Sequence, residues 1–315
     1  MNINELNKRL QFEFMNKHYF AIKKAEKAND ALLKMPAYQK LCQLEKELIF
    51  EVAKNKFAKN TNKELEQNLK FLRSEKQKIL EKLGIKKSDL EPKFECKKCQ
   101  DLGFVNNLMC NCFISRRNEE LLKECGFNLS LMATFEKFDT KICKDKSQAA
   151  ALEKLKSKLE IWAESYPEIK KRNITLCGTA GVGKTYLCEC LANKLAKKNY
   201  SVCFVSAFDM NNMFLKYHTS FDANKHTNIS PLLESDFLFI DDLGTEPVLK
   251  NVTANYLYLI LSERERHKRP VVISTNLSPE NILDRYGERI YSRIASKQTG
   301  AIFHLEGTDL RISQS

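Results

Sequence analysis

Long apolar runs are missing from this chain of 315 residues. Its longest wholly apolar stretches, such as Tyr256 to Leu261 and Phe237 to Ile240, are far shorter than the roughly 18 residues needed to cross a bilayer. The first residues, MNINELNKRLQFEF, mix charges into every turn and contain no apolar signal-peptide core. These absences argue against a membrane helix, and we expect a protein that remains in the cytoplasm.

Glycine and proline are scarce as well, with 10 and 7 residues, which excludes a collagen-like or linker-like composition. The apolar share of 43% and the aromatic share of 10% are too high for a disordered chain. We find no internal repeat and no low-complexity tract. The 52 Lys and Arg against 40 Asp and Glu give a formal charge of +12, which favours contact with nucleic acid without locating it. The length suggests about two domains.

The front of the chain carries a helical pattern. Apolar residues recur there at helical spacing, as in Leu65, Leu69, Leu72, Ile79, Leu80 and Leu83. A break around residues 30–36 predicts at least two helices, and no heptad persists long enough for a coiled coil. We expect a helical domain over residues 1–92, which is either a partner-binding module or an ordinary helical bundle.

From residue 173 onward, short apolar runs alternate with amphipathic helical stretches. Five of these runs are predicted strands: Ile174 to Cys177, Val202 to Ser206, Phe237 to Ile240, Val271 to Ser274 and Ala301 to Leu305. Such alternation predicts an α/β fold with a parallel sheet flanked by helices. Before it, we expect a helix over residues 115–125, an extended stretch over 128–139 and a further helix that ends near Tyr166.

One motif between a predicted strand and a predicted helix has the pattern GxxxxGK[ST] of a P-loop. Its residues are Gly178, Thr179, Ala180, Gly181, Val182, Gly183, Lys184 and Thr185. Glycines let the backbone approach phosphates closely and aim its N–H groups at them. The motif therefore predicts a nucleotide site in which Lys184 reaches the β- and γ-phosphates and Thr185 holds Mg²⁺.

Two acids, Asp241 and Asp242, come directly after the apolar residues FLFI of a predicted strand. Because α/β sheets bind ligands at the carboxyl ends of their strands, both acids are expected near the P-loop. Asp241 fits the carboxylate on the Mg²⁺ side, and Asp242 could orient or deprotonate the attacking water. Glu246, a little further along, is either a neighbour of this site or a solvated turn residue.

Polar residues also follow the next predicted strand. The group Ser274, Thr275 and Asn276 could sense the γ-phosphate through the attacking water. A simple strand-to-helix cap is the alternative, because Ser278 and Pro279 also resemble a helix start. Arg289 and Arg293 share one helical face, and Arg311 lies close to the end of the sequence. Arginine stabilises charge that develops on a phosphoryl group, either in cis or from a neighbouring subunit. For any single arginine, a solvated charge is the simpler interpretation.

The 11 cysteines include a cluster in two pairs, Cys96 with Cys99 and Cys110 with Cys112. Paired knuckles of this kind can bring four thiolates to a tetrahedral Zn²⁺, in a closed shell that serves folding or recognition rather than catalysis. An iron cluster and free thiols are the alternatives. The other cysteines are expected to be small core residues, namely Cys42, Cys125, Cys143, Cys177, Cys188, Cys190 and Cys203.

Aromatic and cationic side chains alternate between residues 208 and 226. They are Phe208, Phe214, Lys216, Tyr217, His218, Phe221, Lys225 and His226. This mixture is typical of surfaces that bind single-stranded nucleic acid, where bases stack on aromatic rings. An amphipathic helix with core Phe and surface Lys explains the same pattern.

From about residue 130 onward, the motifs ATFEKFD, GTAGVGKT, FIDDLGTEP, ISTNLSPE, RYGERIYSRI and GTDLR occur in order. Together they resemble the DnaC/DnaI family of helicase-loader ATPases, a branch of the AAA+ superfamily that also includes IstB-like transposition helpers. The resemblance implies these roles: Lys184 and Thr185 in Walker A, Asp241 and Asp242 in Walker B, Asn276 as sensor 1, Arg293 as the arginine finger for a neighbouring subunit, and Arg311 as sensor 2. The general AAA+ pattern has Glu where this chain has Asp242.

The resemblance also implies an organisation in three parts. Residues 1–92 would bind the helicase, residues 93–127 would form the Cys₄ zinc segment with a connector helix, and residues 128–315 would form a P-loop AAA+ core without a C-terminal lid. The implied cofactors are ATP, Mg²⁺ and Zn²⁺. The implied partners are a hexameric DnaB-like replicative helicase, single-stranded DNA and further copies of this chain in a nucleotide-dependent oligomer.

The sequence therefore favours an ATP-hydrolysing loader of the replicative helicase in replication initiation. Two alternatives remain: an IstB-like transposition helper, and a non-hydrolysing, zinc-containing DNA-binding adaptor. The long helical front with its cysteine cluster favours the loader.

Overall fold

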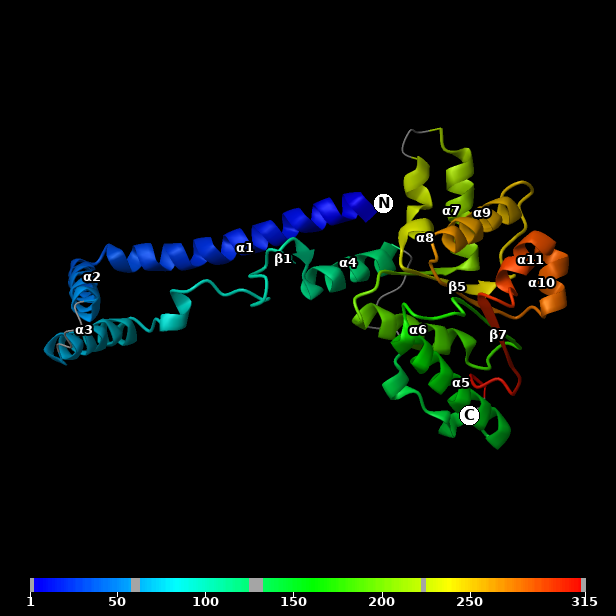
Figure 1. The fold of residues 1–315 in the computed structure, drawn as a ribbon, viewed down its shortest axis with the longest axis horizontal. Coiled ribbons are helices and arrows are strands. Elements are labelled where there is room, and N and C mark those ends of the chain that lie inside the picture. The colour runs from blue at the N-terminus through cyan, green and yellow to red at the C-terminus, as the bar shows by residue number, and fades with distance from the viewer. Residues whose placement is uncertain (1–2, 58–62, 125–132, 222–224, 313–315) are drawn as a thin grey trace. The chain divides into compact units, whose positions relative to one another are not determined.

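The computed structural model describes residues 3–57, 63–124, 133–221 and 225–312 (Figure 1). The chain divides into two compact units. We call Met1–Leu10 together with Asn111–Ser315 the sheet unit, and Gln11–Cys110 the helical unit. None of the described helices has the length and hydropathy that crossing a membrane requires.

The helical unit contains most of α1 and two further long helices, which confirms the predicted helical front. Its elements are α1 (Ile3–Leu33, which begins in the sheet unit), α2 (Pro36–Phe57), α3 (Lys63–Lys82), the short helix η1 (Lys87–Asp89), β1 (Phe104–Val105) and β2 (Leu108–Met109). The predicted break falls between α1 and α2, where Pro36 takes the first helical position, which needs no N–H donor.

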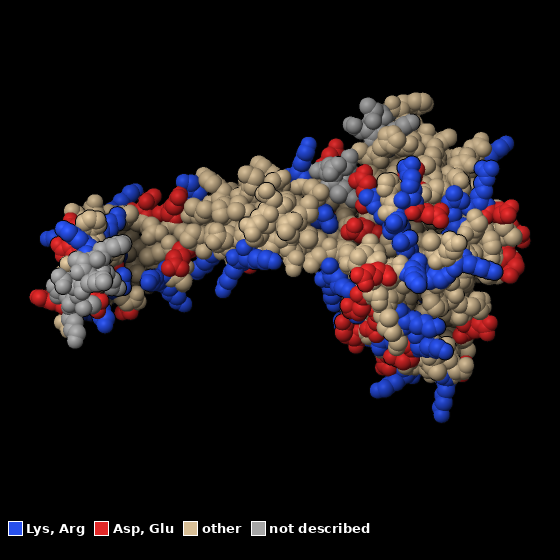
Figure 2. Space-filling view, viewed as in Figure 1, with Lys and Arg blue, Asp and Glu red and all other residues tan. Residues whose placement is uncertain are grey.

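Burial between the helices of this unit is limited. A small cluster of Leu32, Tyr38 and Leu80 joins α1, α2 and α3, and Glu45 pairs with Arg73 at 2.9 Å and Lys76 at 2.6 Å. Figure 2 shows charged side chains of both signs gathered over α2 and α3. Among the described residues, the two larger clusters of buried apolar side chains lie in the sheet unit.

Five parallel strands form the sheet, and all five predicted strands are confirmed. They are β3 (Asn173–Gly178), β4 (Val202–Ser206), β5 (Phe237–Leu243), β6 (Val271–Thr275) and β7 (Gly300–Leu305). The order across the sheet is β4-β5-β6-β3-β7, and every neighbouring pair is parallel. β3 and β5 therefore flank β6 and end at the same edge, which brings the P-loop and the two acids together.

Helices cover both faces of the sheet in the sheet unit, as the α/β prediction requires. The unit's helices are α4 (Asn111–Glu124), α5 (Lys146–Ser165), α6 (Lys184–Lys197), α7 (Ala207–Thr219), α8 (Ser230–Glu234), α9 (Thr253–Arg266), α10 (Pro279–Tyr286) and α11 (Glu288–Ile294), with short helical turns η2 (Phe135–Lys137), η3 (Thr140–Ile142) and η4 (Lys225–Asn228). The fold is a five-stranded parallel sheet flanked by helices, with the predicted P-loop between β3 and α6.

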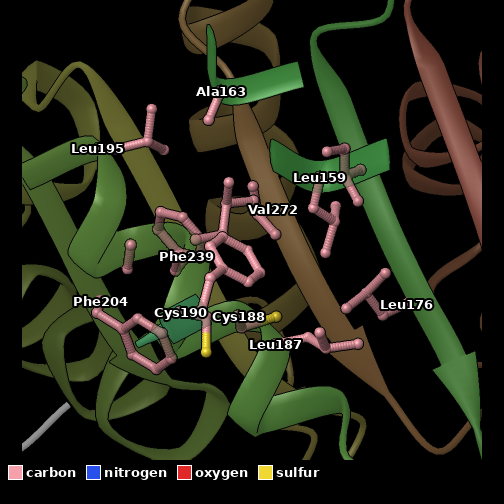
Figure 3. Packing of buried hydrophobic residues seen from close by; sticks show 14 of the residues in the cluster. Leu159, Ala163, Leu176, Leu187, Cys188, Cys190, Leu195, Phe204, Phe239 and Val272 are labelled. Carbon is pink, nitrogen blue, oxygen red and sulfur yellow. The ribbon is translucent and has the colours of Figure 1, made fainter. Parts of the chain in front are cut away.

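Alternate residues of each strand supply two separate cores. Phe239 belongs to the cluster under α5 and α6, whereas its neighbour Ile240 belongs to the cluster under α7, α9, α10 and α11. In Figure 3, Phe239 and Val272 lie among side chains such as Leu159 and Leu187. Because both faces are buried, the strands read as continuous apolar runs.

The cysteine predictions hold for the core of the sheet unit. The side chains of Cys177, Cys188, Cys190 and Cys203 are all buried. Cys42 and Cys143 are only partly buried, and Cys125 lies outside the described residues.

Two predicted boundaries differ from the structure. The helix expected from residue 115 begins at Asn111, because the fully buried Phe113 extends its apolar face. The stretch expected to be extended over 128–139 forms η2 in its described part, because Phe135 turns into the core of the sheet unit. Residues 128–132 lie outside the described part of the chain.

A fully buried arginine, Arg264, ties the loops before β5 and β6 together. Its guanidinium donates to the backbone oxygens of Leu232 at 2.9 Å, Ser235 at 3.0 Å, Asp236 at 3.1 Å and Pro270 at 2.8 Å. Burial lowers the pKa of Arg264 to about 9, so the group keeps its charge at neutral pH. The charge is spread over several carbonyl dipoles, which makes its burial tolerable.

We expect Arg264→Met to lower the free energy of unfolding by about 3 kcal/mol, because several buried carbonyls would lose a charged donor. Chemical denaturation measures this loss. Arg266→Met removes an exposed arginine from the same helix and should change stability by less than about 0.5 kcal/mol. Equal stability of the two variants would refute the structural role of Arg264.

Candidate nucleotide-binding site

The P-loop lies between β3 and α6, and glycines fill its special backbone positions. Gly181 and Gly183 have φ values of +76° and +99°, which residues with a Cβ rarely adopt. At Gly178, a Cβ would lie 2.1 Å from the backbone oxygen of Leu305 on the neighbouring strand β7. These glycines therefore permit a loop whose backbone N–H groups, together with the N-terminus of α6, can face a phosphate.

Lys184 is the first residue of α6, and its side chain is almost completely buried. Its Nζ donates to the backbone oxygens of Gly178 at 2.9 Å and Thr179 at 2.6 Å, and to Oδ1 of Asn276 at 2.7 Å. Burial lowers the pKa of Lys184, against the attraction of Asp242 and Asp241. The ammonium thus lies against the P-loop, and it is joined to Asn276 as the sequence predicted for two residues of one site.

The two acids on β5 have different environments. Asp241 is buried and accepts from Oγ1 of Thr185 at 3.0 and 3.1 Å, whereas Asp242 lines an open cavity. Burial raises the pKa of the Asp241 carboxyl, although the hydrogen bond from Ser274 opposes the shift. Thr185 and Asp241 therefore lie side by side as oxygen ligands of the kind that Mg²⁺ prefers.

Ser274 on β6 connects the two acids, a role that the sequence did not reveal. Its hydroxyl donates to Oδ1 of Asp241 and accepts from the backbone N–H of Asp242 at 2.9 Å. The side chain is fully buried. A serine at the end of an apolar strand has no distinctive spacing, so only the register between β5 and β6 shows this contact.

A cavity of about 580 Å³ opens beside these groups. Its lining includes the predicted residues Ala180, Gly181, Gly183, Lys184, Thr185, Asp242, Asn276 and Arg311. Arg311 therefore reaches the site from the far end of the chain, as predicted. The cavity size suits a nucleotide-sized ligand.

An apolar wall of this cavity was not predicted. It includes Phe138, Ile142, Cys143, Leu152 and Tyr186, with Lys137 to Thr140 at its rim. The rings of Phe138 and Tyr186 are 5.8 Å apart. Such a wall is suited to the flat face of a nucleobase. Apolar residues in a short irregular segment resemble core residues in sequence, so the folded structure is needed to find them.

Arg293 does not line the cavity. Its guanidinium lies over the ring of Tyr258, 4.3 Å from the centroid, donates to that residue's hydroxyl at 3.1 Å, and is 3.5 Å from the carboxylate of Glu265. Arg289 is exposed on the same helix, α11. Both arginines are thus separate from the nucleotide site of their own chain.

Glu246 is neither a member of the cavity lining nor a solvated turn residue. It is 1% exposed, accepts from the backbone N–H of Gly244 at 2.9 Å and from the hydroxyl of Tyr286, and its backbone oxygen accepts from Arg285. Burial raises the pKa of Tyr286, and Glu246 adds to the shift. Glu246 therefore links the turn after β5 to α10. The interpretation as a solvated turn residue is wrong, and a role as a neighbour of the site stays a prediction.

The four predicted metal ligands are brought together. The Sγ atoms of Cys96, Cys99, Cys110 and Cys112 all lie within 4.8 Å of one another, and those of Cys96 and Cys110 are 3.8 Å apart. Four sulfurs at about 2.3 Å from a tetrahedral Zn²⁺ would be about 3.8 Å apart. The cluster therefore fits a zinc ion.

A carboxylate and a backbone N–H stabilise the conformation of the first cysteine pair, Cys96 and Cys99. Asp101 is buried and accepts from the backbone N–H groups of Glu95 at 2.9 Å and Cys96 at 2.7 Å. The backbone N–H of Gly103 donates to the sulfur of Cys99 at 3.3 Å. Such contacts orient metal ligands and favour the thiolate form.

The aromatic and cationic segment divides into core and surface residues. Phe214 is fully buried on α7, whereas Phe208 and Phe221 are exposed. Tyr217 packs edge-to-face against Tyr256. Of the cations, Lys216 and His218 are exposed, and the side chain of Lys225 lies outside the described part. The amphipathic-helix interpretation is confirmed for Phe214, whereas binding of single-stranded nucleic acid by the exposed residues stays a prediction.

Comparison with known proteins gives a family. The family described as "IstB-like ATP binding protein" matches residues 97–291. The chain belongs to this family. The match covers more than half of the chain, and it agrees with the resemblance to the DnaC/DnaI and IstB branch that the motifs indicate.

Two curated relatives represent the two branches of the resemblance. The "Replicative helicase loader DnaI" of Bacillus subtilis (strain 168) is 25% identical over 188 residues, which cover 58% of this chain and 56% of the relative. The "Insertion sequence IS5376 putative ATP-binding protein" of Geobacillus stearothermophilus is 23% identical over 148 residues, 46% of this chain and 57% of the relative. The chain thus spans about half the length of the curated relatives it matches.

Among solved structures, the crystal structure of the DnaC helicase loader is similar. It is 21% identical with a TM-score of 0.45, and the alignment covers 56% of this chain and 97% of that one.

We expect Ser274→Ala to lower the Mg²⁺-dependent affinity for ATP about ten-fold, because Asp241 loses a donor and the N–H of Asp242 loses its acceptor. Titration with a fluorescent ATP analogue, with and without Mg²⁺, measures the change. Ser278→Ala removes a hydroxyl that caps α10 outside the cavity lining and should leave the affinity unaltered. Identical affinities of the two variants would count against the bridging role of Ser274.

Proposed function

We propose that this protein is an ATP-dependent loader of a replicative DNA helicase. The observation that carries the proposal is the assembly of Lys184, Thr185, Asp241 and Asn276 at one edge of the sheet, beside a cavity of nucleotide size. Membership of the ATP-binding family supports the nucleotide, and the likeness to a relative named as a helicase loader supports the partner.

In this proposal each residue has a distinct task. Lys184 binds the β- and γ-phosphates, while Thr185 and Asp241 hold Mg²⁺, which neutralises phosphate charge when bound. Asp242, in the cavity wall, orients the attacking water, and Asn276 positions the same water. Arg311, which lines the cavity next to Leu310, whose backbone N–H donates to the P-loop oxygen of Gly181 at 3.0 Å, would contact the phosphates.

Arg293 would act on the nucleotide of a neighbouring copy. It lies outside its own cavity on α11, and a guanidinium stabilises the charge that develops during phosphoryl transfer. The site is then complete only between two copies, so assembly depends on nucleotide.

The remaining parts would supply the partners. We assign residues 1–92 to the helicase, residues 93–127 to a zinc-stabilised connector and residues 128–315 to the ATPase core. The exposed Phe208 and Phe221, with Lys216 and His218 nearby in sequence, would bind single-stranded DNA.

A second candidate is a transposition helper. The family description and the likeness to an insertion-sequence ATP-binding protein favour it. Such a protein would act with a transposase on duplex DNA. A non-hydrolysing adaptor is the third candidate, and it would show no phosphate release that depends on Asp242.

We expect the protein to form a stable complex with the replicative helicase of its host when ATP and Mg²⁺ are present. Lys184→Ala should weaken the complex, because the ammonium contacts both the P-loop and Asn276. Size-exclusion chromatography with light scattering measures the complex.

Two controls make this experiment decisive. Lys250→Ala, at an exposed lysine outside the cavity, should leave the complex intact, whereas removal of residues 1–92 should abolish it. If no complex with the helicase forms under any nucleotide condition and the protein captures a transposase, the loader proposal is wrong. The protein is then a transposition helper.

We also expect one zinc ion per chain, bound by the four clustered cysteines. Cys110→Ser should lose the ion, because three thiolates no longer close the shell. Plasma mass spectrometry of the purified protein measures the metal. Cys143→Ser, at a cysteine outside the cluster, should keep it. Stoichiometric iron with visible absorbance would contradict the zinc assignment.

A further inference from the structure

The amino ends of β6, β3 and β7 form the sheet edge opposite the nucleotide site. These strands are neighbours, and Asn173 is in register with Gly300, while Ile174 is in register with Val272. In parallel strands, the residues that precede these positions emerge at one edge. Segments 168–172, 263–269 and 295–299 therefore meet there, although they lie far apart in the sequence.

Hydrogen bonds join the three segments directly. The backbone N–H of Asn173 donates to the oxygen of Thr299 at 2.8 Å, and its side-chain Oδ1 accepts from the N–H of Val271 at 3.1 Å. Nζ of Lys171 donates to the backbone oxygen of Lys297. The meeting of these segments is thus a local contact and not merely a consequence of strand order.

A partly buried tryptophan and a buried arginine make hydrogen bonds at the same edge. Trp162, the single tryptophan of the chain, donates from Nε1 to the backbone oxygen of Lys171 at 2.6 Å and packs edge-to-face against Phe237 at 5.8 Å. Arg264 binds the backbone oxygen of Pro270, directly before β6. Neither Trp162 nor Arg264 is among the residues that line the nucleotide cavity, so their hydrogen bonds position the edge.

Positive charge dominates the three segments. They contain eight Lys and Arg against three Glu. Of the acids, Glu263 pairs with Arg266, and Glu265 lies 3.5 Å from Arg293. Each segment contains one exposed lysine that precedes its strand by the same number of residues. These lysines are Lys170, Lys268 and Lys297.

We propose that this basic edge, formed by segments 168–172, 263–269 and 295–299, binds the phosphate backbone of duplex DNA. The phosphate backbone of duplex DNA suits exposed lysines that three neighbouring strands bring to one edge, because it carries one charge per about 1.7 Å of its axis. Within these three fully described segments no large apolar side chain is exposed, so the edge has no platform for stacking the bases of a single strand.

The edge is independent of the ATP site. The nucleotide cavity lies at the carboxyl ends of the strands, and a strand of five residues separates the two edges by about 17 Å. Duplex DNA and nucleotide can therefore be bound together. The exposed aromatic residues of the 208–226 segment are likewise separate in sequence from all three basic segments.

The test compares two triple variants of the full chain. Lys170→Gln, Lys268→Gln and Lys297→Gln remove the row of charges, whereas Lys144→Gln, Lys154→Gln and Lys250→Gln remove three exposed lysines elsewhere in the sheet unit. Fluorescence anisotropy of a labelled duplex is measured over a series of salt concentrations. We expect the slope of log affinity against log salt to become shallower by about 3 for the first variant only, since each lost phosphate contact removes about 0.9.

Several outcomes would overturn the proposal: no duplex binding by the wild-type protein, an equal change in both variants, or a loss confined to a single-stranded oligonucleotide. Circular dichroism and ATP affinity serve as checks on folding, and both should match the wild-type protein because all six lysines are exposed. The proposal would also be wrong if the edge variant binds duplex DNA normally but loses affinity for an acidic protein partner. The edge would then bind a protein and not DNA.

Discussion

Burial of both faces of the parallel sheet is the constraint on which the rest of the sheet unit depends. Phe239 and Ile240 pack into opposite cores, and the same alternation holds for the neighbouring strands. A strand buried on both faces is apolar over most of its length and reaches solvent mainly at its ends. The charged groups of the sheet are therefore concentrated at its two edges, with the P-loop and acids at one and exposed lysines at the other.

The parts of the fold that the sequence could predict are those with a local signature. The P-loop needs glycine at positions of positive φ and close approach, so its residues are visible as a spaced pattern. The five strands are continuous apolar runs for the reason given above. The cysteine cluster is recognisable because metal ligands require a fixed number of thiolates at short spacing.

What the sequence could not predict depends on register and tertiary packing. Ser274 bridges two acids only because β6 lies beside β5. Glu246 resembles a turn acid in sequence, yet its carboxylate is buried against Tyr286 from a helix 40 residues away. The apolar wall around Phe138 forms from a segment without regular periodicity. In each case the partner lies far along the chain, so no local pattern records the contact.

Asp242 shows how backbone geometry can offset a departure from the usual residue. The register between β5 and β6 shifts between Ile240 and Leu243, and Asp242 has a φ of +52° within this irregularity. Bulges next to functional sites redirect a side chain, and Asp adopts the left-handed region more readily than Glu does. The turn of the backbone sends Asp242 into the cavity wall while Asp241 stays buried against Thr185. A short acid at this position is thus matched to a backbone that already carries it towards the cavity.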